Sequence, residues 1–326
     1  MDFHNVAQLG EAVLTGYQIS MDDAMALTEV AIPDIPLLAA YANKIRHTFA
    51  GDGVDMCGII SARSGRCSQD CRFCAQSAHY LTSAPIYPLR ERKEIIAAAR
   101  QAQREGAKRV SLVTSGKGIS QPSDFAAILS AIEAVIDATG LQVCANLGMI
   151  SEAQCISLAK AGVKRYAHNL ETSRRFYPSI CTTHSYEERV ATLTAAQAAG
   201  MELCSGGIIG MGETWQDRLE LAFALRRFAP ASVPINILVP IQGTPLAGMI
   251  PPLPLEVIKT FAVFRFILPE TIIRPAGGRE LNLRDFQGYL LLSGANGLII
   301  GNYLTFSGRD TAADFRMVND AGLYPL

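Results

Sequence analysis

The sequence predicts an α/β protein: a (β/α)8 barrel of the TIM type with an N-terminal helical extension. First, eight short apolar segments alternate with amphipathic helical segments from residue 54 onward, a pattern typical of parallel strands, and eight strands can close a barrel. Second, 326 residues with 49% apolar side chains can bury a core of that size. Third, most of the cysteine and polar residues that suggest a functional site follow the carboxyl ends of the expected strands, where (β/α)8 barrels have their active sites. An open doubly wound sheet is the alternative.

The first fifty residues have a helical pattern. Residues 21–30 begin with acidic side chains, and residues 34–49 carry apolar side chains at helical spacing with basic residues near the end. We expect one barrel domain, residues 51–326, after a helical extension of residues 1–50. Helices are expected at 91–106, 123–140 and 214–229. The expected strands are 54–62, 109–116, 141–148, 165–171, 202–210, 233–240, 271–278 and 297–304.

The composition bears on partners and compartment. Charged residues make up 18% of the chain and the net charge is −1, which argues against nucleic acid or an anionic membrane as the main partner. We find no secretory signal and no apolar run of about 18 residues. Eight cysteines in such a chain predict reduced thiols in the cytoplasm, where clustered cysteines bind metal more often than they pair.

Three of these cysteines lie close together. The segment GRCSQDCRFCAQ, residues 65–76, contains Cys67, Cys71 and Cys74. Three thiolates can hold three corners of a [4Fe-4S] cluster and leave one iron open to a small molecule. A zinc site with His79 as fourth ligand is the alternative, because zinc tolerates such spacings.

This loop, with Phe73 before its last cysteine, resembles the signature of the radical S-adenosylmethionine (SAM) superfamily. The segment GGIIGMGE resembles the superfamily's second, cofactor-binding signature. The residues that match this signature are Gly206, Ile208, Gly210 and Glu213. The glycines are expected to allow close backbone approach to a flat ligand. The resemblance implies a [4Fe-4S] cluster and SAM as cofactors.

Further segments resemble the biotin synthase family across residues 50–305, among them YAHNLETS, INILVPIQGTPL and GRELNLRDFQGYLLLSGANGLIIGNYLT. The resemblance implies sulfur insertion into dethiobiotin, the last step of biotin biosynthesis. A 5′-deoxyadenosyl radical would abstract hydrogen, with no side chain as catalytic acid or base. An auxiliary iron–sulfur cluster would donate the sulfur. The family also suggests a homodimer and a reducing partner such as flavodoxin or ferredoxin.

The resemblance assigns cofactor and substrate contacts. Arg189 would pair with the SAM carboxylate, and Asn169 and Glu171 would contact its ribose. Asn169 and Asn236 would reach the ureido ring of dethiobiotin, for which an amide offers both donors and acceptors. The family usually has Asp at position 171 and often has Asn where Ala167 stands.

The auxiliary cluster position departs from the family pattern. Cys144, Cys204 and Arg274 match the family's ligands, but Ser111 stands where the strand-two cysteine is expected, and a serine oxygen is a poorer iron ligand. Either Ser111 ligates a [2Fe-2S] cluster, or the cluster is absent, or another cysteine replaces Ser111. We favour the third, with Cys181 joining Cys144 and Cys204 around a larger four-iron cluster and Arg274 donating hydrogen bonds. The remaining cysteines, Cys57 and Cys155, are expected to be packing residues.

Two other functions are open on sequence alone. A related radical SAM barrel could act on an amino-acid-derived substrate without inserting sulfur, and the Ser111 change supports it. A zinc-stabilised binding barrel without redox chemistry is a candidate from another class.

Overall fold

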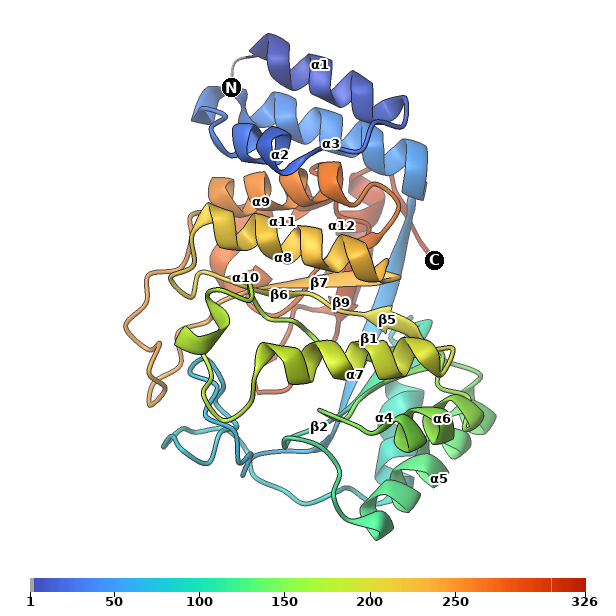
Figure 1. The fold of residues 1–326 in the computed structure, drawn as a ribbon. Coiled ribbons are helices and arrows are strands. Elements are labelled where there is room, and N and C mark those ends of the chain that lie inside the picture. Colours follow the sequence, from blue (N-terminus) through green and yellow to red (C-terminus); the bar gives the residue numbers. More distant parts are fainter. Residues whose placement is uncertain (1–2, 306) are drawn as a thin grey trace.

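A curled parallel sheet surrounded by helices makes up most of the molecule (Figure 1). This computed structural model describes residues 3–305 and 307–326, without the side chain of Phe3. The barrel strands are β1 (Gly53–Arg63), β2 (Arg109–Thr114), β3 (Gln142–Asn146), β4 (Arg165–Ala167), β5 (Glu202–Cys204), β6 (Gly207–Ile209), β7 (Ser232–Ile237), β8 (Ile272–Pro275) and β9 (Gly297–Ile300). Each predicted strand is present, and the sheet runs β9-β1-β2-β3-β4-β5-β7-β8.

The sheet curls so that its last strands meet. The backbone N–H of Asn296, just before β9, donates to the carbonyl of Ile273 on β8 (2.9 Å), and its side-chain Oδ1 accepts from the N–H of Ile273 (2.9 Å). The predicted TIM-like barrel is therefore confirmed. The fifth expected strand is divided into β5 and β6, which pair in succession with β7. A short strand that the sequence did not predict, β10 (Tyr324–Pro325), pairs with the start of β1.

Helices cover the outside of the sheet, and polar residues fix where several of them begin. Ser151, Ser185 and Thr214 form capping boxes at the starts of α6, α7 and α8. The barrel helices are α4 (Arg92–Arg104), α5 (Pro122–Thr139), α6 (Glu152–Lys160), α7 (Tyr186–Ala198), α8 (Trp215–Phe228), α9 (Pro254–Ile267), α10 (Arg279–Leu283), α11 (Gln287–Leu291) and α12 (Thr311–Asp320).

The N-terminal extension is helical, as predicted. Its helices α1 (Phe3–Leu14), α2 (Met21–Thr28) and α3 (Ile35–Ala50) stack over α9 in Figure 1. The Nζ of Lys259 on α9 donates to the carbonyls of Thr28 and Val30 at 2.8 Å. Within the described residues, no single helix is long and apolar enough to cross a membrane. The segments Met21–Thr28 and Ile32–Ala50 meet that test only together, with a bend of 111° between them.

Arg265 on α9 is fully buried and holds the end of this helix against the barrel. Its guanidinium donates to the carbonyls of Leu268, Pro269, Thr271 and Gly294, and to Oδ1 of Asn296.

Arg265→Met leaves these acceptors unpaired, and we expect it to lower the free energy of unfolding by about 3–5 kcal/mol in urea titrations. The exposed Arg227→Met is the matched control and should change it by less than about 0.5 kcal/mol. Equal effects of the two changes would contradict this role.

Candidate active site

The loop after β1 gathers the three clustered cysteines at the carboxyl end of the barrel. Its backbone closes on itself through the N–H of Cys67, which donates to the carbonyl of Gln76 (2.9 Å), and the N–H of Ala78, which donates to the carbonyl of Cys67 (2.7 Å). The Gln76 side chain accepts from the hydroxyl of Ser64 at the start of the loop (3.0 Å). All three cysteines consequently line one cavity of about 180 Å³.

Polar groups at the ends of β2, β3 and β4, together with Arg189 of α7, complete the wall of this cavity, which we call the cofactor cavity. It contains the predicted Phe73, Asn169, Glu171 and Arg189. The buried Oγ1 of Thr114 and Nε2 of His168 line it too, and neither has a hydrogen-bond partner among the described residues. Burial lowers the pKa of His168 well below its usual value, so the ring is neutral. Unsatisfied polar atoms beside three thiols fit a polar, cluster-bound ligand.

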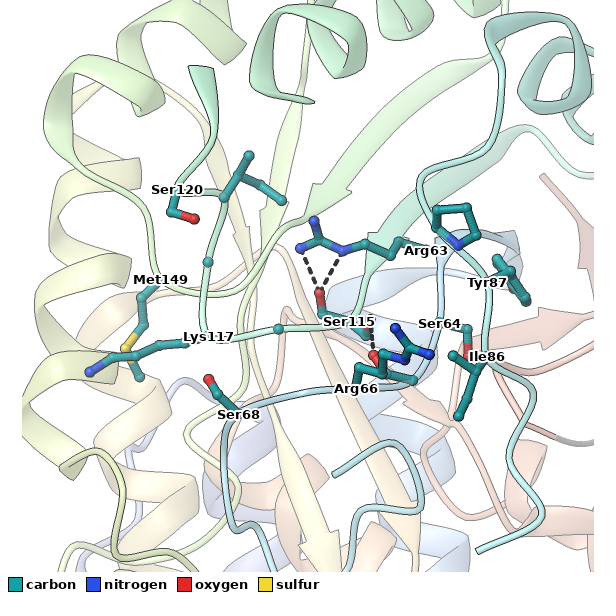
Figure 2. A pocket seen from close by; sticks show the side chains of 15 residues that line it. Arg63, Ser64, Arg66, Ser68, Ile86, Tyr87, Ser115, Lys117, Ser120 and Met149 are labelled. Carbon is teal, nitrogen blue, oxygen red and sulfur yellow. Dashed lines mark hydrogen bonds between the residues drawn. The ribbon is translucent and has the colours of Figure 1, made fainter. Parts of the chain in front are cut away.

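A wider opening of about 970 Å³ adjoins the cofactor cavity and shares Ser115 and Lys117 with it (Figure 2). Arg63 at the end of β1 donates from Nε and Nη2 to the carbonyl of Ser115 (3.0 and 2.7 Å). The hydroxyl of Ser115 donates in turn to the carbonyl of Gly65 (2.8 Å). These bonds fix the cysteine loop to the loop after β2.

Arg189 on α7 points into the cofactor cavity and is paired from three sides. Its Nη1 lies 3.5 Å from Oε1 of Glu171 and donates to the carbonyl of Asn169 (2.9 Å), and its Nε donates to the hydroxyl of Tyr177 (2.6 Å). Burial raises the pKa of Glu171, and the positive charge of Arg189 opposes this. Glu171 also has a φ of 70°, and such left-handed residues cluster at functional sites.

The residues of the second signature shape the turn that leads from β5 and β6 to α8. A Cβ on Gly206 would lie 1.8 Å from the carbonyl oxygen of Pro234, so this glycine lets β5 and β7 approach each other. Gly210 adopts a φ of 93°. The buried carboxylate of Glu213 accepts from the N–H groups of Gly210 and Met211 (2.8 and 2.7 Å) and from Arg218 (2.7 Å). These contacts fix the turn, and Ile208 also lines a cavity of about 220 Å³. That the four residues contact the cofactor stays a prediction.

Asp217 holds the start of α8 just beyond that turn. Its carboxylate accepts from the hydroxyls of Ser173 (2.6 Å) and Thr214 (2.7 Å), the N–H of Thr214 (2.8 Å) and Arg175 (2.7 Å). Burial alone would raise the pKa of Asp217, but the hydrogen bonds outweigh it, and the pKa lies below the usual value.

This lowered pKa predicts how the stability of the protein depends on pH. Because the folded pKa is below the unfolded one, the carboxylate stabilises the fold above about pH 4, and its contribution is lost as the pH falls further. Asp217→Asn should lower the free energy of unfolding by about 1–3 kcal/mol at pH 7 and by less below pH 4, measured in urea. The exposed Asp285→Asn is the control. An Asp217→Asn difference that stays constant with pH would contradict the assignment.

A second cavity, of about 220 Å³, lies next to the cofactor cavity and shares Phe73, Cys74, Gln76 and Leu304 with it. Its wall is mostly apolar, with Asn236 of β7 as a polar exception. The Asn236 side chain accepts from the N–H of Gly277 (2.9 Å) and donates to the carbonyl of Gly207 (3.2 Å). A mostly apolar cavity with two fixed amides, those of Asn236 and Gln76, suits a small, largely apolar molecule.

A second group of thiols lies inside the barrel and consists of Cys57, Cys144 and Cys204. Asp55 and Cys57 alternate along β1 with Met56, which packs in the outer core, so Cys57 faces the interior. Burial and then the charge of Cys57 raise the pKa of Cys144 to about 12. Burial raises the pKa of Cys57 too, and the charges of Asp55 and Cys204 add to this. The register agrees with this grouping. Cys57 pairs with Arg109 on β2, whose Nη1 lies 3.9 Å from Sγ of Cys144. Cys204 pairs with Ser232, which shares Arg274 with Asp55 of β1.

Arginines surround this interior group of thiols. Arg109 donates from Nη1 toward Sγ of Cys144 (3.9 Å), whereas Arg274 donates to Asp55 (2.6 Å) and to the hydroxyl of Ser232 (2.9 Å). The buried Nε of Arg109 and Nη1 of Arg165 have no hydrogen-bond acceptor among the described residues. The other nitrogens of Arg165 pair with Glu202 (2.9 and 2.8 Å), and Nε of Arg109 lies 3.8 Å from Asp55. Among the described residues, one free N–H on each arginine beside buried thiols fits an anionic group such as an iron–sulfur cluster. The guanidinium of Arg274 is hydrogen-bonded to Asp55 and Ser232. These contacts suit a hydrogen-bond donor better than an iron ligand.

The structure differs from the sequence prediction on the cysteine that replaces the missing ligand. Cys181 does not join Cys144 and Cys204; its Sγ lies 3.7 Å from Sγ of Cys71 in the β1 loop. The reason is Asp70, whose carboxylate accepts hydrogen bonds from residues 182 and 183 and fixes that segment to the loop. The hydrogen bond between the two thiols raises the pKa of Cys71 and lowers that of Cys181.

Sequence analysis treated Cys57 as a packing residue and did not place it beside Cys144 and Cys204. The signal that could have found it is the alternation along β1, because the inward-facing Asp55 implies an inward-facing Cys57. Ser111 on β2 pairs in register with Cys144 on β3, at the position where the family has a cysteine. Cys155 is buried in the core, as predicted, and His79 is exposed, with its Nε2 against the carbonyl of Ser68.

Comparison with known proteins decides the family. Residues 62–225 match the radical SAM superfamily, and residues 234–324 match the biotin and thiamin synthesis associated domain. The chain is 49% identical to the biotin synthase of Pelotomaculum thermopropionicum, over 97% of this chain and 98% of that protein. It is 47% identical to the biotin synthase of Clostridium acetobutylicum, over 98% of both. The chain belongs to the biotin synthase family. It is thus a radical SAM, iron–sulfur enzyme of biotin biosynthesis.

Solved structures agree with this fold for a member of the biotin synthase family. Methylornithine synthase superposes with a TM-score of 0.86 at 21% identity, covering 98% of this chain and 97% of that one. The hydrogenase maturase HydG superposes with a TM-score of 0.85 at 16% identity, covering 100% and 76%. At these identities the likeness concerns the barrel and its N-terminal helices.

Proposed function

We propose that this enzyme converts dethiobiotin to biotin by SAM-dependent radical sulfur insertion, with the sulfur supplied by an auxiliary cluster inside the barrel. The observation that carries the proposal is the presence of two separate sets of three cysteines. One set, Cys67, Cys71 and Cys74, lines the cofactor cavity. The other set, Cys57, Cys144 and Cys204, lies among buried arginines in the barrel. The second set supplies thiolates for a sulfur-donating cluster, which sulfur insertion requires.

The first set would hold the [4Fe-4S] cluster. When bound, that cluster supplies the electron that cleaves SAM into methionine and the 5′-deoxyadenosyl radical. The chain's own residues bind and orient the cofactor. Arg189 would hold the carboxylate of SAM with its planar guanidinium, and Glu171 and Asn169 would contact the ribose hydroxyls. The neutral His168 and the hydroxyl of Thr114 offer further polar contacts in the same wall.

Arg189 tests this assignment of the cofactor cavity. Arg189→Met removes the cation that faces Glu171, and we expect it to weaken SAM binding about 10- to 100-fold, because a hydrogen bond to a charged group contributes about 1.5–3 kcal/mol. Isothermal titration of the cluster-loaded protein with SAM measures the change. Arg174→Met, on an exposed side chain, is the control. Unchanged affinity in Arg189→Met would show that SAM does not use this arginine.

The second cavity is the proposed dethiobiotin site. Its apolar wall suits an aliphatic chain, and the amide of Asn236, held by Gly277 and Gly207, can offer hydrogen bonds to a urea. Because the cavity adjoins both the cofactor cavity and the interior strands, the substrate would lie between the radical and the sulfur. Excluding water from this space protects the radical from side reactions.

The auxiliary cluster is the part of the proposal that departs most from the family pattern. Cys57 on β1 would take the place that Ser111 on β2 leaves without a thiolate, next to Cys144 and Cys204. Three thiolates suit a four-iron cluster with one corner open for sulfide. Arg109, Arg165 and Arg274 would then stabilise its negative charge through hydrogen bonds.

An anaerobic assay tests the function. Purified, cluster-reconstituted enzyme is mixed with SAM, dethiobiotin and a flavodoxin or ferredoxin reducing system, and biotin, 5′-deoxyadenosine and methionine are quantified. Two deoxyadenosines per biotin are expected, one for each new C–S bond. Deoxyadenosine without biotin would favour a radical enzyme that lacks sulfur insertion. The family resemblance also supports a cytoplasmic homodimer, which light scattering can check.

A further inference from the structure

A compact group of metal-binding side chains lies where α7 begins, behind the cysteine loop. It consists of Cys71, Cys181 and His184, whose ligand atoms all lie within 4.8 Å of one another, and all three residues are buried. We propose that the cluster-free protein binds a single divalent ion of the Fe²⁺ or Zn²⁺ class at these three residues. This goes beyond the proposed function, because only Cys71 belongs to both sites.

The distances fit one tetrahedral ion. With metal–sulfur bonds of about 2.3 Å and metal–nitrogen bonds of about 2.0–2.1 Å, tetrahedral angles place two sulfurs about 3.8 Å apart and a sulfur and nitrogen about 3.6 Å apart. The Sγ atoms of Cys71 and Cys181 are 3.7 Å apart, and Nε2 of His184 is 3.8 Å from Sγ of Cys181. Thiolates on different irons of a cluster lie farther apart than this. The spacing fits a single ion, and in the metal-free protein it is spanned by the hydrogen bond between the two thiols.

The outer contacts of His184 leave one nitrogen for an ion. Its Nδ1 lies 2.8 Å from Oε1 of Gln69 and 3.2 Å from Sγ of Cys181. When Nδ1 donates to Gln69, Nε2 carries the lone pair. A metal-binding histidine usually donates its other ring nitrogen to an oxygen in this way, which fixes the tautomer and the ring orientation. Tyr177 packs edge-on against the ring, with the centroids 5.9 Å apart, and limits its rotation.

Hydrogen bonds between two distant segments hold the group together. Asp70 accepts from the N–H groups of Thr182 (2.9 Å) and Thr183 (3.1 Å), and the N–H of Arg72 donates to the carbonyl of Ile180 (2.9 Å). Cys71 and Cys181 are therefore held close before any metal binds. Two thiolates and a neutral imidazole balance the charge of a divalent ion when both thiol protons leave, and a water can fill the fourth position.

The two uses of Cys71 exclude each other. When Cys71 binds an iron of the [4Fe-4S] cluster with Cys67 and Cys74, the single ion loses a ligand. The ion would hold the loop against residues 180–184 until a cluster is built, and it would compete with cluster assembly. This exclusion makes the site testable with variants that remove one metal group and leave the other.

The test uses the full-length apo-protein, kept reduced and anaerobic, and titrated with Co²⁺ as a spectroscopic probe. We expect one Co²⁺ per chain, with thiolate-to-cobalt charge-transfer bands and the d–d absorption of a tetrahedral site. Cys181→Ala, Cys181→Ser and His184→Ala should weaken Co²⁺ binding by at least about tenfold. The same Cys181 variants should still acquire the [4Fe-4S] chromophore when reconstituted with iron and sulfide.

Cys67→Ala and Cys74→Ala are the matched controls. They should keep the Co²⁺ spectrum and fail to form the cluster, whereas Cys71→Ala should lose both. Circular dichroism melting shows whether each variant is folded. A Co²⁺ spectrum that survives in Cys181→Ser and His184→Ala, or that disappears in Cys74→Ala, would overturn the proposal. Loss of the iron–sulfur chromophore in the wild type would instead count against the proposed function.

Discussion

Alanine at Cys67, Cys71 or Cys74 is expected to abolish SAM cleavage and biotin formation together. Each change removes one ligand of the predicted [4Fe-4S] cluster, and the loop contains no further cysteine. Cys181, whose Sγ lies 3.7 Å from that of Cys71, belongs to the segment before α7. The loss should exceed the roughly 10- to 100-fold effects of changes in outer-shell partners. Deoxyadenosine and biotin, quantified after anaerobic turnover with a chemical reductant, report both reactions.

Cys155→Ala is the control for this series. Cys155 is a buried thiol of α6 in the apolar core and belongs to neither group of cysteines. Its replacement should change the free energy of unfolding by about 1 kcal/mol and leave the absorption of the [4Fe-4S] cluster intact. Substantial SAM cleavage by any of the three loop variants would show that the cluster is held elsewhere.

Cys57→Ala is expected to separate the two reactions. It leaves the cofactor cavity intact, so the variant should still cleave SAM, yet biotin should fall to background because the auxiliary cluster loses a thiolate. Ser111→Ala should leave biotin formation measurable, because the loss of an outer-shell partner typically costs roughly 10- to 100-fold and removes no ligand. Product analysis of both variants, under the same single-turnover conditions, measures this split.

The opposite result would show that the third ligand of the auxiliary cluster lies on β2. If Ser111→Ala stops sulfur insertion and Cys57→Ala does not, the serine oxygen holds the auxiliary cluster and Cys57 is a packing residue. Ser111→Cys adds a thiolate in register with Cys144; if Cys57 is the ligand, this change should restore part of the biotin yield to Cys57→Ala.

Much of the fold was predictable because the barrel repeats a local pattern. Each strand is apolar and short, and each is followed by an amphipathic helix, so sequence periodicity located all eight strand positions. The division of the fifth strand was not predictable. It depends on the close approach of Gly206 to the backbone of Pro234, a contact between segments that periodicity does not describe.

The residues of the candidate site also fall into a group that the sequence predicted and a group that it did not. Cys67, Cys71 and Cys74 were found because they are neighbours in the chain, and Asn169, Glu171 and Arg189 because they match family motifs. The partner of Cys181 depends on the hydrogen bonds of Asp70 across more than a hundred residues, which no local pattern records. The place of Cys57 depends on which face of β1 is turned inward, and the mostly apolar neighbours of Cys57 concealed it.

The most direct test of the account is to count clusters in wild type, Cys57→Ala and Cys181→Ala. Anaerobically reconstituted proteins are analysed for iron and sulfide, and Mössbauer spectra resolve the cluster types. The account predicts two clusters in the wild type, only the [4Fe-4S] cluster of the loop in Cys57→Ala, and both clusters in Cys181→Ala. A single cluster of about four irons in the wild type, or the loss of the auxiliary cluster in Cys181→Ala alone, would contradict it.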